Sequence, residues 1–114
     1  MDWSKYEEGK TIGQKGSEDG VTIEDLENIQ GARITLERDG NIAPYSVTIG
    51  IYGLMFHTYF SSSIEKAWKY FEFAQSKIDQ ILKEYDTPEA QRDKNWHDKK
   101  NQLIEELVEH NDGG

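Results

Sequence analysis

His57 is the residue of this chain whose type and neighbours most strongly suggest chemistry. On the expected strand register it shares one sheet face with guanidinium, hydroxyl and phenol groups, from Arg33, Ser46, Thr48 and Tyr59. Such a face could bind an anion or supply an acid and a base. However, the sequence places no Asp or Glu to orient the imidazole, and antiparallel sheets commonly leave one face polar. The pattern therefore favours a solvated or partner-covered face over a catalytic one.

Residues 17–28 form an acidic stretch without any basic side chain. Its acids are Glu18, Asp19, Glu24, Asp25 and Glu27. Their spacing differs from that of a calcium-binding loop, which needs a closing bidentate Glu. A charged edge strand that discourages unwanted pairing is the simpler interpretation. The alternative is a contact surface for a basic protein partner.

Other motifs that could bind a ligand or support catalysis are incomplete. Residues 9–11 read Gly-Lys-Thr but lack the upstream glycine and the preceding strand of a phosphate-binding loop. Asp93 and His97 have the spacing of one helix face, yet no third metal ligand accompanies them. The absence of cysteine excludes disulfides, thiolate nucleophiles and cysteine-ligated zinc. We therefore expect a non-enzymatic protein with no metal and no cofactor.

The candidate face depends on a hairpin expected between residues 45–51 and 54–60. Alternating apolar residues predict these strands and another over residues 31–38. A two-residue turn at Tyr52 and Gly53 would pair Ile51 with Leu54, Ile49 with Phe56, Val47 with Thr58 and Tyr45 with Phe60. A slip by one residue would bury His57 and expose Phe56, so the apolar pattern favours this register.

A long amphipathic helix is predicted after the hairpin, over residues 62–85. Ser62 and Glu65 fit a capping box at its start. Apolar residues then recur every three or four positions, which predicts a stripe that lies on the apolar face of the sheet. Tyr70 and Phe73 fall outside this stripe, so they are candidates for packing against another helix or another chain.

The remaining segments complete an α+β chain. Thr87 and Pro88 predict the start of a second helix over residues 88–110. We expect an antiparallel sheet of four or five strands in meander order over about residues 9–60. One long helix would pack on one face of it, and the second helix would end the chain. Residues 9–110 would form a single domain, with flexible ends at residues 1–8 and 111–114.

The net charge of −9 and the pI of about 4.7 limit the classes of partner. An acidic surface repels nucleic-acid phosphate and anionic lipid, whereas it speeds association with a basic partner. The N-terminus lacks the apolar core of a signal peptide, and no apolar run is long enough to span a bilayer. The sequence thus predicts a cytoplasmic protein that binds neither nucleic acid nor membrane.

Two stretches carry a resemblance to known proteins. GARITLE at residues 31–37 and GIYGLMFHT at residues 50–58 resemble a group of small uncharacterised bacterial proteins. Some small acidic bacterial proteins of this build are immunity proteins, which block a toxin. The resemblance covers roughly residues 12–85 and describes a hairpin core rather than a site. It implies no catalytic residue.

Three hypotheses of function follow. The first is a non-enzymatic acidic protein-binding module, of the immunity-inhibitor type, that acts on a basic partner through residues 17–28 or the His57 face. The second is a small-ligand or enzymatic site on the His57 face, where Arg33, Thr48, His57 and Tyr59 would converge around a pocket. The third is a structural homodimer.

Overall fold

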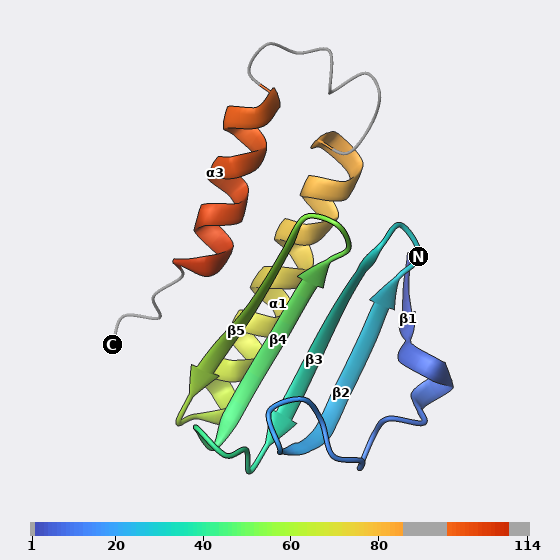
Figure 1. Cartoon of the computed structure of the whole chain (residues 1–114), viewed down its shortest axis with the longest axis vertical. Coiled ribbons are helices and arrows are strands. Elements are labelled where there is room, and N and C mark those ends of the chain that lie inside the picture. The colour runs from blue at the N-terminus through green and yellow to red at the C-terminus, as the bar shows by residue number, and fades with distance from the viewer. Residues whose placement is uncertain (1, 86–95, 110–114) are drawn as a thin grey trace. The chain divides into compact units, whose positions relative to one another are not determined.

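The computed structural model describes residues 2–85 and 96–109, and it has an α+β fold (Figure 1). One antiparallel sheet contains, in chain order, β1 (Trp3–Lys5), β2 (Val21–Asn28), β3 (Ala32–Arg38), β4 (Tyr45–Ile51) and β5 (Met55–Ser61). The 3-10 helix η1 (Tyr6–Gly9) follows β1. After the sheet come α1 (Ile64–Gln80), the π-helix η2 (Ile81–Tyr85) and α3 (Trp96–Val108). The predicted fold class, a meander sheet with a long helix and a C-terminal helix, is confirmed.

The chain divides into two compact units, residues 1–72 and residues 73–114. The first contains the sheet and the N-terminal part of α1, and the second contains the rest of α1, η2 and α3. Within the second unit, Leu103 and Leu107 of α3 are buried, and Lys77 forms an ion pair with Glu106. The single domain expected over residues 9–110 stays a prediction.

Residues 3–5 form a strand, although a flexible N-terminus was expected over residues 1–8. Trp3–Lys5 form β1, which pairs with β2 and places Trp3 opposite Asn28. A strand of 3 residues is too short for alternation to reveal it, which explains why the sequence pattern missed it. The helix start predicted at residues 87 and 88, the candidate ligand Asp93 and the tail at residues 111–114 lie outside the described residues.

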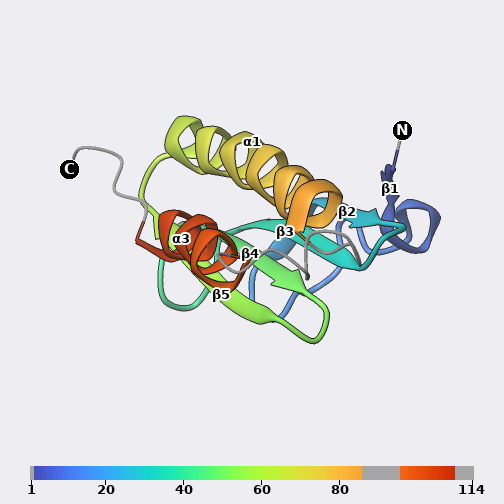
Figure 2. The same ribbon diagram turned by 90° about the horizontal axis from the view of Figure 1, so that it is seen from above.

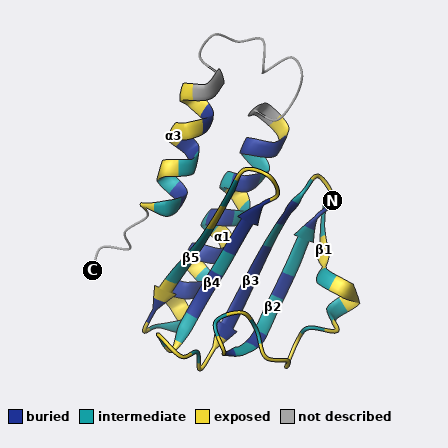
Figure 3. Cartoon of the chain, viewed as in Figure 1, coloured by how far each residue is buried: buried dark blue, intermediate teal, exposed yellow. Residues whose placement is uncertain are grey.

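The core of the first unit lies between one face of the sheet and the N-terminal part of α1 (Figure 2). Alternate residues of β3 and β4 are fully buried on this face, as predicted (Figure 3): Ala32, Ile34, Leu36, Val47 and Ile49. Ala67, Tyr70 and Phe71 of α1 are buried as well. Tyr70 was expected outside the buried stripe, but its ring stacks on that of Tyr59, with centroids 4.3 Å apart. This pair joins α1 to the edge strand β5.

The cap of α1 lies one residue later than predicted. The helix begins at Ile64, and the backbone N–H of Lys66 donates to the Ser63 hydroxyl at 3.3 Å. The Ser63 hydroxyl in turn donates to Glu65 at 2.8 Å. Ser63 is therefore the N-cap, because its oxygen satisfies a backbone N–H of the first turn.

The register predicted for β4 and β5 is wrong by one residue. Ile51 pairs with Met55, Ile49 with His57 and Val47 with Tyr59. Residues 52–54 form the connection, in which Gly53 has a φ of +76° and the Leu54 N–H donates to Ile51. A primed two-residue turn would need positive φ at Tyr52, a conformation that tyrosine rarely adopts.

The shift by one residue moves every side chain of β5 to the opposite face. Phe56 and Phe60 are consequently exposed, by 78% and 39%. His57 and Tyr59 instead lie on the face that α1 covers. The shift therefore also changes which residues can form a site.

Candidate functional site

The sheet face opposite α1, here called the open face, presents its side chains in rows across four strands. The pairing of β2 to β5 aligns Glu27, Arg33, Gly50 and Phe56 in row one, Asp25, Thr35, Thr48 and Thr58 in row two, and Thr22, Glu37, Ser46 and Phe60 in row three. Neighbouring rows are two residues apart along a strand, which corresponds to roughly 7 Å. Charged and aromatic groups thus occupy row one, whereas row two combines one carboxylate, Asp25, with three hydroxyls.

Residues 6–17, here called the N-terminal segment, lie against this face and line one side of a cavity of about 610 Å³. The Gly13 N–H donates to the Thr22 carbonyl at 2.8 Å, and the Thr22 N–H donates to the Gln14 carbonyl at 2.9 Å. These bonds hold the segment along β2. The sheet and the β4–β5 turn line the cavity with Thr22, Arg33, Thr35, Thr48, Gly50, Tyr52 and Phe56.

A buried carboxylate in row two, Asp25, holds Arg33 of row one in place. Asp25 is fully buried and accepts two hydrogen bonds from Arg33, at 2.9 and 2.7 Å. The hydroxyls of Thr35 and Thr11 also donate to it, at 3.1 and 2.9 Å. The hydrogen bond to Asp25 is the main cause that raises the pKa of Arg33. The Arg33 guanidinium lies 3.7 Å from the centroid of the Tyr6 ring, a cation–π contact. Asp25 and Arg33 therefore fasten both ends of residues 6–11 to the sheet.

A second buried carboxylate anchors the residues that follow the N-terminal segment. Glu37 is fully buried and accepts hydrogen bonds from the backbone N–H groups of Glu18, at 3.2 Å, and Gly20, at 3.1 Å. Gly16 approaches so closely that a Cβ there would lie 2.4 Å from the Glu37 carboxyl carbon. Among the described residues Glu37 forms no ion pair, so backbone amides alone hold its carboxylate.

Two exposed aromatic rings border the row-one end. The ring of Phe56 lies across Gly50, where an added Cβ would be 3.3 Å from its Cζ. The Tyr52 hydroxyl donates to Glu27 at 3.2 Å. Burial and this hydrogen bond raise the pKa of the Tyr52 phenol. One face of the Phe56 ring covers the glycine, and its 78% exposure leaves the other face free for a ligand.

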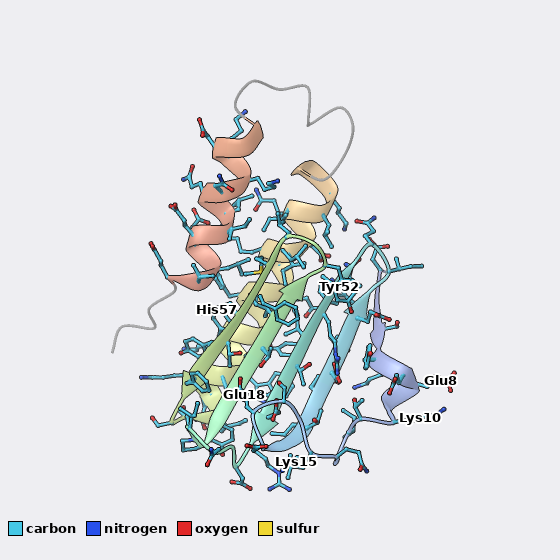
Figure 4. The ribbon with its side chains drawn as sticks, viewed as in Figure 1. Glu8, Lys10, Lys15, Glu18, Tyr52 and His57 are labelled. Carbon is cyan, nitrogen blue, oxygen red and sulfur yellow. The ribbon has the colours of Figure 1, made fainter. Side chains whose placement is uncertain are left out.

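Lysines of the N-terminal segment supply positive charge. Lys10 and Lys15 both line the cavity, together with one acid, Glu7. Figure 4 shows Tyr52 at the β4–β5 turn and Lys15 toward the opposite end of the sheet. Lys15 pairs with Asp19 at 3.3 Å, and Lys10 forms no ion pair with a described residue. The aromatic groups and the lysines therefore lie at different levels along the strands.

The structure separates the five residues proposed for the His57 face. Arg33 and Thr48 line the cavity. Ser46 lies on the same face in row three, buried, and its Oγ has no hydrogen-bond partner among the described residues. His57 and Tyr59 lie on the opposite face because of the register shift. Burial lowers the pKa of His57. The predicted convergence of Arg33, Thr48, His57 and Tyr59 is therefore wrong.

The acids of residues 17–28 interact with groups of the chain itself. β2 lies between β1 and β3, so the predicted charged edge strand is an inner strand. Besides Asp25, the side chains and their partners are Glu18 with Thr58, Asp19 with Lys15, Glu24 with Lys5, and Glu27 with Tyr52. A basic partner that used these carboxylates would compete with existing contacts.

Sequence reasoning missed the contribution of the N-terminal segment. Tyr6, Lys10, Thr11 and Lys15 reach the cavity through contacts with residues far along the chain. The available signal was the recurrence of glycine, since Gly9 and Gly13 adopt φ values of +85° and +83°. Repeated turns of this kind allow a segment to follow a curved surface.

Comparison with known proteins gives no relative. No protein-family model matches the chain, and neither a curated protein nor a solved structure gives a significant match. In the described parts of the chain no helix has the length and apolar character needed to cross a bilayer. The same residues contain no cluster of three or more His, Asp or Glu arranged to hold a metal ion. The functional argument therefore rests on the cavity.

Proposed function

We propose that this protein binds a small organic molecule in the cavity between the N-terminal segment and the open face, without transforming it. The observation that carries the proposal is the cavity itself, of about 610 Å³, which falls within the usual range for small-molecule sites. Aromatic rings and a few fixed polar groups line it, as in most such sites.

Binding is favoured over catalysis by the state of the polar groups. The carboxylate of Asp25 already accepts four hydrogen bonds, so no lone pair remains directed at a ligand proton. His57, the expected acid or base, is on the other face of the sheet. None of the described residues that line the cavity is a histidine. A general acid–base pair would require such groups within hydrogen-bond reach of the substrate.

The other hypotheses stay predictions. The net charge of −9 is compatible with an immunity-type inhibitor of a basic partner and with a cytoplasmic location. The exposed aromatic residues are compatible with a homodimer. The engagement of the acids of residues 17–28 within the chain gives less support to that stretch as a docking surface. The cavity offers open volume between the N-terminal segment and the sheet, which is why we rank ligand binding first.

The test is an NMR screen of ¹⁵N-labelled protein against a fragment library of broad chemistry. Ligands are expected to shift the amides of Arg33, Thr35 and Thr48. The variant Thr48→Phe would fill the cavity and should abolish these shifts, whereas the control His57→Ala, on the opposite face, should retain them. If no fragment shifts the cavity amides, or if Thr48→Phe retains all shifts with a native fold, the proposal is wrong.

A further inference from the structure

The cavity has two chemically different parts. Tyr52 and Phe56 stand at the row-one end, beside the guanidinium of Arg33. Aromatic side chains stack on flat rings, and an arginine plane does the same. Two of the five N–H donors of Arg33 bind Asp25, so others remain available to a ligand. This end therefore suits a planar ring that carries hydrogen-bond acceptors.

The lysines lie further along the strands. Thr11 contacts Asp25 of row two, and Lys10 precedes it. The Gln14 carbonyl accepts a hydrogen bond from the N–H of Thr22 in row three. The next residue, Lys15, pairs with Val21 in an isolated antiparallel β-bridge, one residue further from row one than Thr22. Measured along the strand direction, the backbones of Lys10 and Lys15 therefore lie roughly 7 Å and roughly 14 Å or more from row one. A group that reaches either ammonium from the ring needs a linker of several bonds.

Basic side chains outnumber acidic ones in the cavity lining, whereas acidic side chains outnumber basic ones in the whole chain. The chain has 22 acids and 13 bases, whereas the cavity lining has Lys10, Lys15 and Arg33 against one acid, Glu7. Asp25 balances the charge of Arg33, so the available positive charge comes from the two lysines. The pair between Lys15 and Asp19 is exposed, and such pairs are weak. The overall charge of −9 opposes an anion at long range, but salt screens that repulsion beyond about 10 Å.

We infer that the cavity binds a planar aromatic ring joined by a linker of several bonds to an anionic group, as in a nucleoside monophosphate or a long-chain aryl carboxylate. This inference rests on the proposed function and specifies its ligand class. The ring would lie at Tyr52 and Phe56, and the anion would lie at one of the two lysines that line the cavity, Lys10 or Lys15. A cationic ligand would supply no counter-charge to Lys10, which forms no ion pair with a described residue.

The test is calorimetric titration with matched pairs of compounds. Adenosine and guanosine monophosphates are compared with their nucleosides, and indole-3-butyrate is compared with its amide. At least one acid should bind about tenfold more tightly than its uncharged counterpart, as expected for a charge-assisted contact. Comparison of the phosphate and carboxylate series identifies which anion the site prefers.

Four variants separate the two parts of the site. Lys10→Gln with Lys15→Gln should weaken the acid about tenfold and so remove its preference over the uncharged compound. Phe56→Ala should weaken both compounds of a pair by roughly three- to tenfold, because it removes the stacking surface. The matched controls are Lys69→Gln, on α1, and Phe60→Ala, an exposed phenylalanine of β5 outside the cavity. Both controls should bind as the parent protein does.

The outcomes distinguish this inference from the proposed function. Equal binding of acids and their uncharged counterparts overturns the inference, as does an unchanged preference in the double lysine variant. If neither series binds while other fragments shift the cavity amides, the ligand class is wrong and the proposed function stands. If no fragment of any chemistry reaches the cavity, both fail.

Discussion

The guanidinium of Arg33 binds the fully buried carboxylate of Asp25 through two hydrogen bonds, of 2.9 and 2.7 Å. The side chain of Arg33 is 35% exposed, so water can hydrate one partner but not the other. Because of this difference in exposure, removal of the Asp25 carboxylate and removal of the Arg33 guanidinium have different consequences. Loss of the carboxylate leaves a cation that can turn toward solvent, whereas loss of the cation leaves a buried anion held only by hydroxyls.

Asp25→Asn should lower the free energy of unfolding by about 2–3 kcal/mol. Breaking a buried ion pair usually costs about 3–5 kcal/mol, and the partial exposure of Arg33 reduces that figure. Urea denaturation measures the change. The control Asp19→Asn removes an exposed pair and should cost at most about 0.5 kcal/mol. Equal costs for the two variants would show that the buried pair contributes nothing beyond a surface pair.

The register of β5 makes a second prediction. Tyr59→Ala removes a ring stacked on Tyr70 and should cost about 2–4 kcal/mol, whereas Phe56→Ala removes a ring that is 78% exposed and should cost about 1 kcal/mol or less. Chemical denaturation of both variants gives the order. A larger cost for Phe56→Ala would support the register with a two-residue turn and reject the one described.

These two residues also show where sequence reasoning reached its limit. The strands β3 and β4 were predictable because their apolar residues fall strictly on one face. In β5, Phe56 and Phe60 alternate with His57 and Tyr59, so large side chains occupy both faces and alternation does not choose between them. The choice depended on the turn, where Gly53 alone adopts positive φ. Because the connection is one residue longer than predicted, each side chain of β5 lies on the opposite face of the sheet from the one expected.

The candidate site was harder to predict than the fold because it is assembled from distant contacts. Arg33 and Thr48 were correctly assigned to one polar face, since strand periodicity determines that assignment. Their partners Tyr6 and Thr11 come from a segment without clear periodicity, and long-range hydrogen bonds to a buried acid place them. Nothing in local propensity indicates that Asp25 is buried rather than solvated.

Stability should fall as the pH is lowered through the range in which His57 titrates. Burial lowers the pKa of His57 from its ordinary value of 6.5, so the unfolded chain binds a proton at a higher pH than the folded chain. Stability from this residue is therefore present above about pH 6.5 and decreases as the pH falls through the lower, folded-state pKa. Urea unfolding at about pH 7.5 and about pH 5.5 should show the decrease.

The control for this pH dependence is His57→Gln, which keeps a polar side chain but does not titrate. The variant should show a smaller decrease in stability between the two pH values than the parent protein. An NMR titration of the parent should place the His57 pKa below 6.5. A value above 6.5, or an identical pH dependence in the variant, would contradict the assigned environment.

Gly16 and Glu37 give the last prediction. A Cβ added at Gly16 would lie 2.4 Å from the Glu37 carboxyl carbon, and hydrogen bonds from Glu18 and Gly20 hold that carboxylate in place. Gly16→Ala should therefore cost about 1–3 kcal/mol through overpacking, because the carboxylate has to move and break these bonds. Glu37→Ala should also destabilise the fold, by about 1–3 kcal/mol, since it leaves buried amides unpaired.

The double variant distinguishes this specific clash from general sensitivity of the loop. Once Glu37→Ala has removed the carboxylate, Gly16→Ala should add little, so the summed single costs should exceed the cost of the double variant by about 1 kcal/mol or more. Hydrogen exchange should lose protection at the Glu18 and Gly20 amides in all three variants. Additivity within about 0.5 kcal/mol would mean that Gly16 is constrained by something other than Glu37.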